Sequence, residues 1–229
     1  MVGRLGGESL PDFLRVHWNS RHPFARQSDL FKTVRSRIQE PADVFNLLGA
    51  MDDDIDTYLA LTQPDASAWQ PDWRTHAREL RMFSVRQPCP MLMAARRKLG
   101  EEDFGGLLRA TTVIAFRYNV IGSQHAGEQE RVYHQAAMLV QKEASPRLRD
   151  VLESMKSIYP SDSAFRQDFA DKSMKSTQSR NAKIVRYILR KLEKQAGTSS
   201  STRNLRPTPS NTCCRKPRSR VGNNLKIGT

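Results

Sequence analysis

A chain of 229 residues, 38% of them hydrophobic, is long enough to bury the apolar core of one or two domains. No apolar run approaches the length of a membrane span, the N-terminus lacks the parts of a signal peptide, and three cysteines, two of them adjacent, form neither a disulfide framework nor a zinc motif. The net charge of +13 belongs to the C-terminal third, because residues 1–141 hold 17 basic and 17 acidic side chains, whereas residues 196–229 hold 7 basic and no acidic ones. These features predict a cytoplasmic globular protein that has no membrane partner, no metal site and no cofactor in this chain.

Apolar periodicity divides the chain into three parts. Residues 1–9 show no such pattern and are predicted to be disordered. From residue 10 onward the spacing predicts helices near residues 10–18, 28–38, 44–62, 73–83, 91–99, 104–118, 132–140, 148–159 and 181–194. No segment alternates apolar and polar residues as a strand does. We therefore expect an all-α multi-helix bundle over residues 10–195 and a disordered basic C-terminal tail over residues 196–229.

Four aspartates, Asp52, Asp53, Asp54 and Asp56, lie close together on the helix predicted for residues 44–62. Clustered carboxylates suggest a metal site of the kind that two-metal nucleases use. Such sites, however, need acids that converge from several elements, and consecutive residues of one helix point in different directions. The sequence therefore favours a solvent-exposed acidic face over a metal site.

Arg117 lies between two aromatic residues near the end of the apolar helix predicted for residues 104–118. An arginine in an apolar segment needs an acidic partner, because a buried charge without one is costly. Glu128 and Glu130, in the first turn of the next helix, are the nearest acids in the sequence that follows. We expect a structural ion pair between Arg117 and one of these two glutamates.

No arrangement of residues indicates a catalytic site. The histidines are scattered, without the spacing of metal ligands, and each is expected at the surface or as a satisfied core residue: His17, His22, His76, His125 and His134. The chain contains neither a glycine-rich phosphate loop nor a nucleophile elbow. The residues themselves do not indicate an enzyme.

The last predicted helix, residues 181–194, is basic on one side. Apolar residues occupy one face, and Lys183, Arg186, Arg190 and Lys194 occupy another. A basic stripe of this kind can follow a DNA phosphate backbone, although lysine-rich faces are often merely solvated. These four residues are the candidate nucleic-acid contacts of the chain.

The order of segments resembles the helical middle region of GmrSD-type modification-dependent restriction endonucleases. The resemblance covers most of residues 10–195 and rests on the succession FLRVHWNS, LFKTVRSRI, DDDIDTYLAL, FGGLLRATTVIAFRYNVIG, ERVYHQAA, SDSAFRQDFAD and IVRYILRKLE. In that family an N-terminal domain handles nucleotide and a C-terminal HNH-type domain uses a divalent metal to cut modified DNA. Neither domain is recognisable here, so the resemblance assigns no catalytic residue to this chain.

The tail carries a further hint of the missing nuclease domain. Intact family members follow the RYIL helix with a segment that resembles Ile-Glu-His-Val-Leu-Pro-Glu. If Pro209 to Lys216 are read in the frame that starts at the third base of each codon, suitable codons encode this segment, and Asn211 with Thr212 allows only His or Tyr at its third position. This coincidence favours a frameshifted tail from about residue 198, and the alternative is a genuine basic disordered tail.

Together these observations predict a helical connector from a GmrSD-like restriction endonuclease, inactive alone and acting in defence against foreign modified DNA. Its expected partners are DNA, through the C-terminal third, and the missing nuclease domain or the product of a neighbouring gene. The alternative is a free-standing helical module that binds nucleic acid or protein.

Overall fold

The computed structural model describes residues 2–175 and 177–197, and all regular secondary structure in this described part is helical, without a strand. The predicted all-α class is confirmed. The α-helices are α1 (Leu10–Asn19), α2 (Leu30–Arg37), α3 (Pro41–Thr62), α4 (Pro71–Phe83), α5 (Cys89–Lys98), α6 (Glu101–Ile114), α7 (Ala126–Lys142), α8 (Leu148–Ser154), α9 (Asp162–Asp171) and α10 (Ser179–Gln195). Three short 3₁₀ helices, η1 (Val2–Leu5), η2 (Pro64–Ala66) and η4 (Lys156–Ile158), and one π-helix, η3 (Ala115–Ile121), complete the described elements. Of the disordered tail predicted for residues 196–229, residues 198–229 lie outside the described residues.

The chain divides into two compact units, and the division falls after Arg186, inside α10. The helical domain was expected to continue to residue 195. The first unit holds α1 to α9 and the first part of α10, and the second unit begins at Tyr187.

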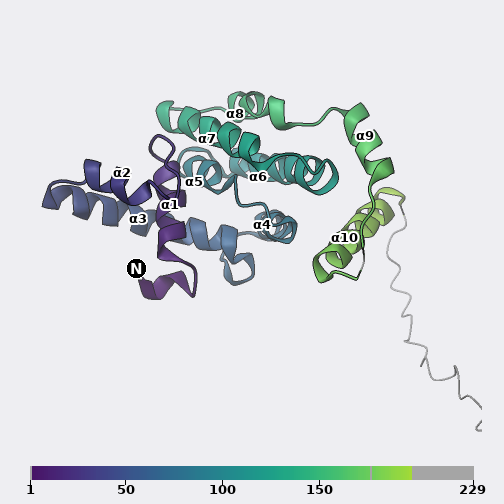
Figure 1. The fold of residues 1–229 in the computed structure, drawn as a ribbon, viewed down its shortest axis with the longest axis horizontal. Helices are drawn as coiled ribbons and strands as arrows, with labels where there is room; N and C mark the ends of the chain where they lie inside the picture. Colours follow the sequence, from purple (N-terminus) through teal and green to yellow (C-terminus); the bar gives the residue numbers. More distant parts are fainter. Residues whose placement is uncertain (1, 176, 198–229) are drawn as a thin grey trace, which may run out of the picture. The chain divides into compact units, whose positions relative to one another are not determined.

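Helix α5 lies at the centre of the first unit, where it packs against α1, α3, α6 and α7 (Figure 1). Its residues 91–95 are all completely buried. Because α5 is enclosed on several sides, this segment has no solvent-exposed face that would need polar residues, which explains why its sequence is a short apolar run. Helices α1, α3, α4, α6 and α7 each bury several residues, whereas α9 has no buried residue.

The N-terminal segment differs from the disordered one that was expected. Residues 2–5 form the turn η1, and Leu5 is only 2% exposed. Arg4 donates to the carboxylates of Asp52 and Asp56 at 2.5 and 2.9 Å, which holds η1 against α3. The anchor consists of one apolar side chain and one arginine that pairs with two carboxylates, which is too short a pattern to show periodicity.

An aromatic cluster joins the loop before α4 to the start of α6. Phe104, which is completely buried, meets Trp69 and Trp73 edge to face, with ring centroids 5.6 and 4.8 Å away. The Arg96 guanidinium lies over the rings of Trp73 and Phe104 at 5.3 and 5.8 Å. Next to the cluster, a Cβ at Gly105 would lie only 2.8 Å from the Trp73 indole nitrogen. The loop is therefore fixed to the body through Trp69, which packs against Trp73 of α4 and Phe104 of α6.

Candidate functional site

Arg117 acts as a brace between the π-helix η3 and the segment that leads into α9. Its guanidinium donates to the Asp162 carboxylate and to the Tyr159 hydroxyl, both at 2.5 Å. The same group lies over the rings of Tyr159 and Phe165, 4.5 and 4.6 Å from their centroids. Its side chain is 11% exposed, so two aromatic faces and one carboxylate replace most of its water.

The predicted partners of Arg117 are wrong. Glu130 pairs instead with Arg15 of α1 at 3.2 Å, and Glu128 is exposed. The physical reason is the π-helix, which places Arg117 opposite η4 and α9 rather than opposite the start of α7. The expectation that an acid pairs with this arginine was correct in kind, but the acid comes from 45 residues further along the chain.

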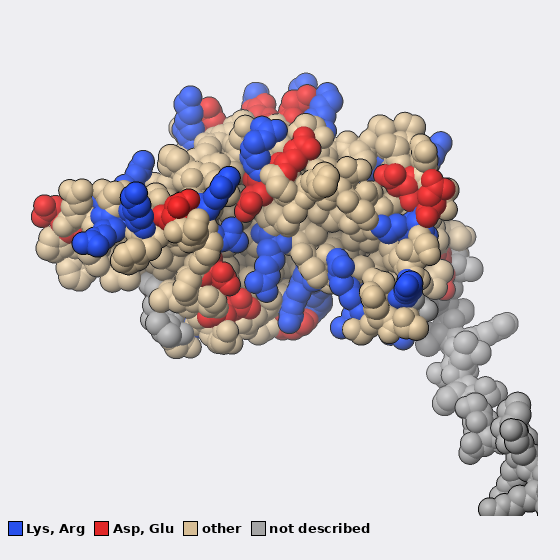
Figure 2. All heavy atoms as spheres, viewed as in Figure 1, with Lys and Arg blue, Asp and Glu red and all other residues tan. Residues whose placement is uncertain are grey.

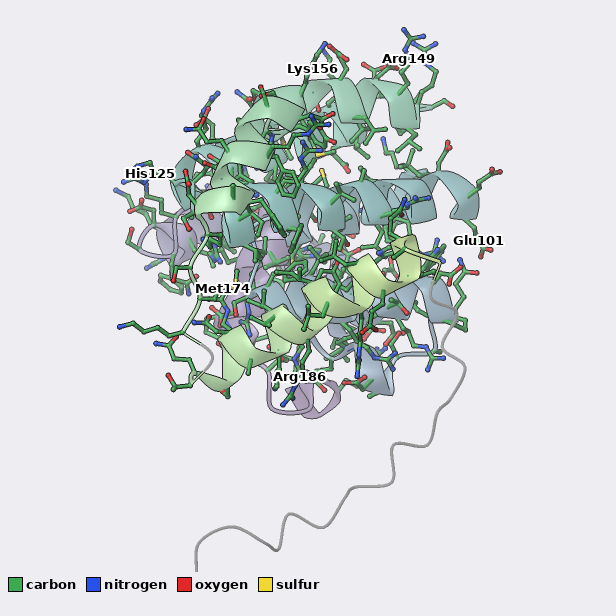
Figure 3. The ribbon with its side chains drawn as sticks, turned by 90° about the vertical axis from the view of Figure 1, so that its right-hand side faces the viewer. Glu101, His125, Arg149, Lys156, Met174 and Arg186 are labelled. Carbon is green, nitrogen blue, oxygen red and sulfur yellow. The ribbon has the colours of Figure 1, made fainter. Side chains whose placement is uncertain are left out.

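The candidate DNA contacts lie on the exposed side of α10. Lys183, Arg186, Arg190 and Lys194 are all exposed, and their spacing places them on one side of a helix. Ile184, on the apolar side, is 2% exposed. Figure 2 shows Lys and Arg side chains gathered over the part of the view that α10 occupies in Figure 1, and Figure 3 labels Arg186 among them.

The four aspartates of α3 do not share one environment. Asp52, Asp53 and Asp56 are exposed as predicted, and Arg4 pairs with the first and the last of these three. Asp54 is only 2% exposed. The interpretation of a uniformly solvated acidic face is therefore wrong for Asp54, because its side chain points into the body of the protein.

Asp54 is the centre of a buried polar cluster formed by α1, α3 and α5. One carboxylate oxygen lies 2.7 Å from His17 Nδ1 and accepts from Arg21 Nε at 3.1 Å. Arg97 Nη1 donates to both carboxylate oxygens at 3.0 Å, and its Nη2 donates to the Ser20 carbonyl at 2.9 Å. We refer to Asp54, His17, Arg21 and Arg97 as the Asp54 cluster. It ties three helices together through one carboxylate.

The electrostatics of the cluster favour an ionised aspartate and a neutral histidine. Burial alone would raise the pKa of Asp54, but the hydrogen bond from His17 and the charges of Arg97 and Arg21 outweigh it and lower that pKa to about 2. Burial lowers the pKa of His17 below its ordinary value, although Asp54 opposes this effect. Because an ionised carboxylate only accepts, His17 Nδ1 carries the proton, and its Nε2 is left as an acceptor.

Acidification should weaken the fold in two steps. In the folded protein the pKa of His17 lies below its ordinary value of 6.5. As the pH falls below about 6.5, the unfolded state therefore binds the proton more readily than the folded state, and the stability of the fold decreases. The stability linked to Asp54 is present above its ordinary pKa of 3.8 and is lost between about 4 and 2, and it amounts to about 2 kcal/mol. Melting temperatures measured between pH 8 and pH 3 should decline through both windows. A melting temperature that stays constant or rises from pH 8 to pH 5 would contradict the neutral, buried state of His17.

The helical pattern contains a signal for this cluster. Asp54 follows Met51 by three residues and precedes Tyr58 by four, and both of these neighbours are buried. His17 follows the buried Phe13 by four residues in the same way. Asp54 and His17 are therefore each a polar residue within the apolar stripe of their own helix. The neighbouring aspartates lie on other faces of α3.

A cavity of about 390 Å³, with more apolar than polar lining, lies beside the Asp54 cluster, where α1 and α2 end and where α3 passes the end of α7. We call it the α1–α3 cavity. Its walls include His17, Trp18, Arg21, Arg37, Asn46 and Gln141. Asp43, Ile38 and Leu47 line the same space, so its walls combine two cations and one acid with apolar side chains.

A second, larger cavity of about 690 Å³ is apolar and lies between α6 and the α8–η4 segment. Val113 and Leu152 contribute to its walls. Arg149 and Lys156 lie at its edge, and Figure 3 shows both at the outer side of α8 and η4. Its composition suits an apolar group better than a polar reactant.

Within the described residues, no group of three or more His, Cys, Asp or Glu side chains is placed to hold a metal ion. Over the same residues, no helix combines the length and apolar character that crossing a membrane requires. No protein-family model and no curated protein matches the sequence, and no solved structure matches the fold.

Proposed function

We propose that this chain is the helical connector of a GmrSD-like restriction endonuclease, and that it contacts the DNA through the basic side of α10. The proposal is supported by the succession of segments and by an all-helical body that fits a middle region. In such an enzyme the connector holds catalytic domains on the same DNA. The chemistry of cutting, with its divalent metal, belongs to those other domains.

The exposed basic side of α10 is the observation that carries the DNA contact. Lys183, Arg186, Arg190 and Lys194 face solvent, and the only acid of α10 is Glu193. Phosphate contacts from such side chains release counterions, which gives affinity without reading the base sequence. Binding of this kind suits a connector, because specificity for modified DNA can then lie elsewhere in the enzyme.

The apolar residues of α10 favour a connector over a free-standing module. Leu189 and Leu192 are 54% and 53% exposed, side by side in helical spacing. Exposed apolar residues that lie together often mark a surface that a partner covers. In the proposed enzyme that partner is the nuclease domain that follows the RYIL helix.

A salt titration tests the DNA contact. Fluorescence anisotropy with a short duplex should show weak binding that falls steeply with salt, because each phosphate contact contributes about −0.9 to the slope of log K against log salt. Changing Lys183, Arg186 and Arg190 to Gln should flatten that slope by roughly three units. Duplexes with modified and unmodified cytosine should bind equally.

A matched triple variant separates specific contacts from net charge. Changing Lys32, Arg35 and Lys142 to Gln removes the same charge from exposed positions on α2 and α7. This control should keep the slope of the parent within about one unit. An α10 variant with the slope of the parent would disprove the contact, and a dissociation constant near 10⁻⁸ M at physiological salt, about that of specific DNA-binding proteins, would favour the free-standing module.

A further inference from the structure

The apolar stripe of α3 continues from the core onto an uncovered surface. In the second half of the helix the stripe consists of Met51, Ile55 and Tyr58, which are all buried. Val44 and Leu48 continue it toward the start of the helix at the same helical spacing, yet they are 44% and 45% exposed. Figure 1 shows this first half of α3 extending away from α1, with α2 beside it. The described residues therefore leave one part of the stripe in water.

Phe45 and Gly49 give this surface a shape that fits itself. Phe45 is 74% exposed, and Gly49 lies one helical turn further along the same side. A Cβ at Gly49 would have free space around it, so a bulky ring lies next to an open position. We call Val44, Phe45, Leu48 and Gly49 the α3 face. If two copies of α3 run antiparallel, a two-fold axis between these positions places each ring over the Gly49 of the other copy.

The charges around the α3 face differ between its two ends. Beside the start of α3, the helix α2 carries three cations and no acid: Lys32, Arg35 and Arg37. Residues 52–56 hold four aspartates and no base, and Arg4 offsets only part of this charge, since Asp53 has no partner among the described residues. The acids at the start of α3, Glu40 and Asp43, are engaged in its capping box. An antiparallel pair therefore brings the acidic end of each copy toward the cations of the other and toward the positive N-terminus of its α3.

We propose that the α3 face binds the α3 face of a second copy of this chain, with the two helices antiparallel. Phe45 of each copy lies over Gly49 and beside Leu48 of the other. The uncovered part of the stripe then leaves water and becomes a small core between the copies. A second copy fits this face because the face itself supplies both the ring and the open position. The contact uses none of the basic residues of α10 and does not depend on the proposed DNA contact.

Sedimentation equilibrium of the whole chain without DNA, over about 1–200 μM protein, tests the proposal. We expect a monomer–dimer equilibrium with a dissociation constant in the micromolar range, because a face of two helical turns is small. Phe45→Glu should weaken the dimer at least roughly tenfold, since it places a charge in the apolar contact. Phe31→Glu makes the same change at an exposed phenylalanine of α2, outside the α3 face, and should alter the constant by no more than about twofold.

Gly49→Leu distinguishes the proposed fit from general stickiness. Leucine is a better helix former than glycine, so this exposed position should tolerate it without loss of the fold. It makes the surface more apolar but fills the open position that receives the ring of Phe45. The proposed contact predicts at least roughly tenfold weaker dimerisation, because the two helices can no longer approach each other. Association through exposed apolar area alone would become stronger instead.

The proposal is overturned if the chain remains a monomer over the whole concentration range. It is also overturned if Phe45→Glu and Phe31→Glu change the dissociation constant equally, or if Gly49→Leu dimerises as tightly as the parent. Because these measurements contain no DNA, their outcome is separate from that of the salt titration.

Discussion

Asp54→Asn should lower the melting temperature by roughly 6–12 °C, because it leaves two arginines without their carboxylate in a buried site. Removing one partner of a buried ion pair costs about 3–5 kcal/mol, and the lower end applies here since the side chains of Arg21 and Arg97 are 22% and 19% exposed. Asparagine keeps the volume of aspartate, so the loss reports the charge rather than a void. Thermal unfolding followed by circular dichroism at pH 7 measures the effect.

Asp53→Asn is the matched control, since Asp53 is the exposed neighbour of Asp54 on the same helix. Its melting temperature should differ from that of the parent by no more than about 2 °C, as for most surface substitutions. The control changes the same functional group one residue away. Equal effects of the two variants would show that the Asp54 cluster contributes nothing to stability.

Phe104→Ala should cost about 3–5 kcal/mol, which lowers the melting temperature by roughly 6–20 °C. Phe104 is completely buried, and its ring makes edge-to-face contacts with Trp69 and Trp73. The substitution leaves a cavity and also removes aromatic contacts, each worth about 0.5–1.5 kcal/mol beyond area burial. Tryptophan fluorescence should report a wetter environment in the folded variant.

Two control variants show whether the loss of stability comes from the buried packing of Phe104 or would follow from removing any phenylalanine. Phe45→Ala changes a side chain that is 74% exposed and should cost less than about 0.5 kcal/mol. Phe104→Leu keeps most of the buried volume and should cost less than Phe104→Ala. If Phe104→Ala unfolds at the temperature of Phe45→Ala, the aromatic cluster does not hold the loop before α4.

Local periodicity alone predicted the all-α class and nearly every helix, because a buried stripe at helical spacing is a property of consecutive residues. The same reasoning placed the basic residues of α10 on one exposed side. The same reasoning also predicted that Arg117 pairs with an acidic side chain. Each of these conclusions depends on neighbours within one helix.

Only the tertiary structure decided which polar residues are buried together. Helical spacing separates Asp54 from its exposed neighbour Asp53, because only Asp54 lies on the apolar stripe of α3, but it does not show that His17, Arg21 and Arg97 meet at the Asp54 carboxylate. Arg117 pairs with Asp162 and not with Glu128 or Glu130, because the π-helix η3 and the packing of α9 place Asp162 beside its guanidinium. Pairings across 37 or 45 residues depend on how helices pack, and no local pattern carries that information.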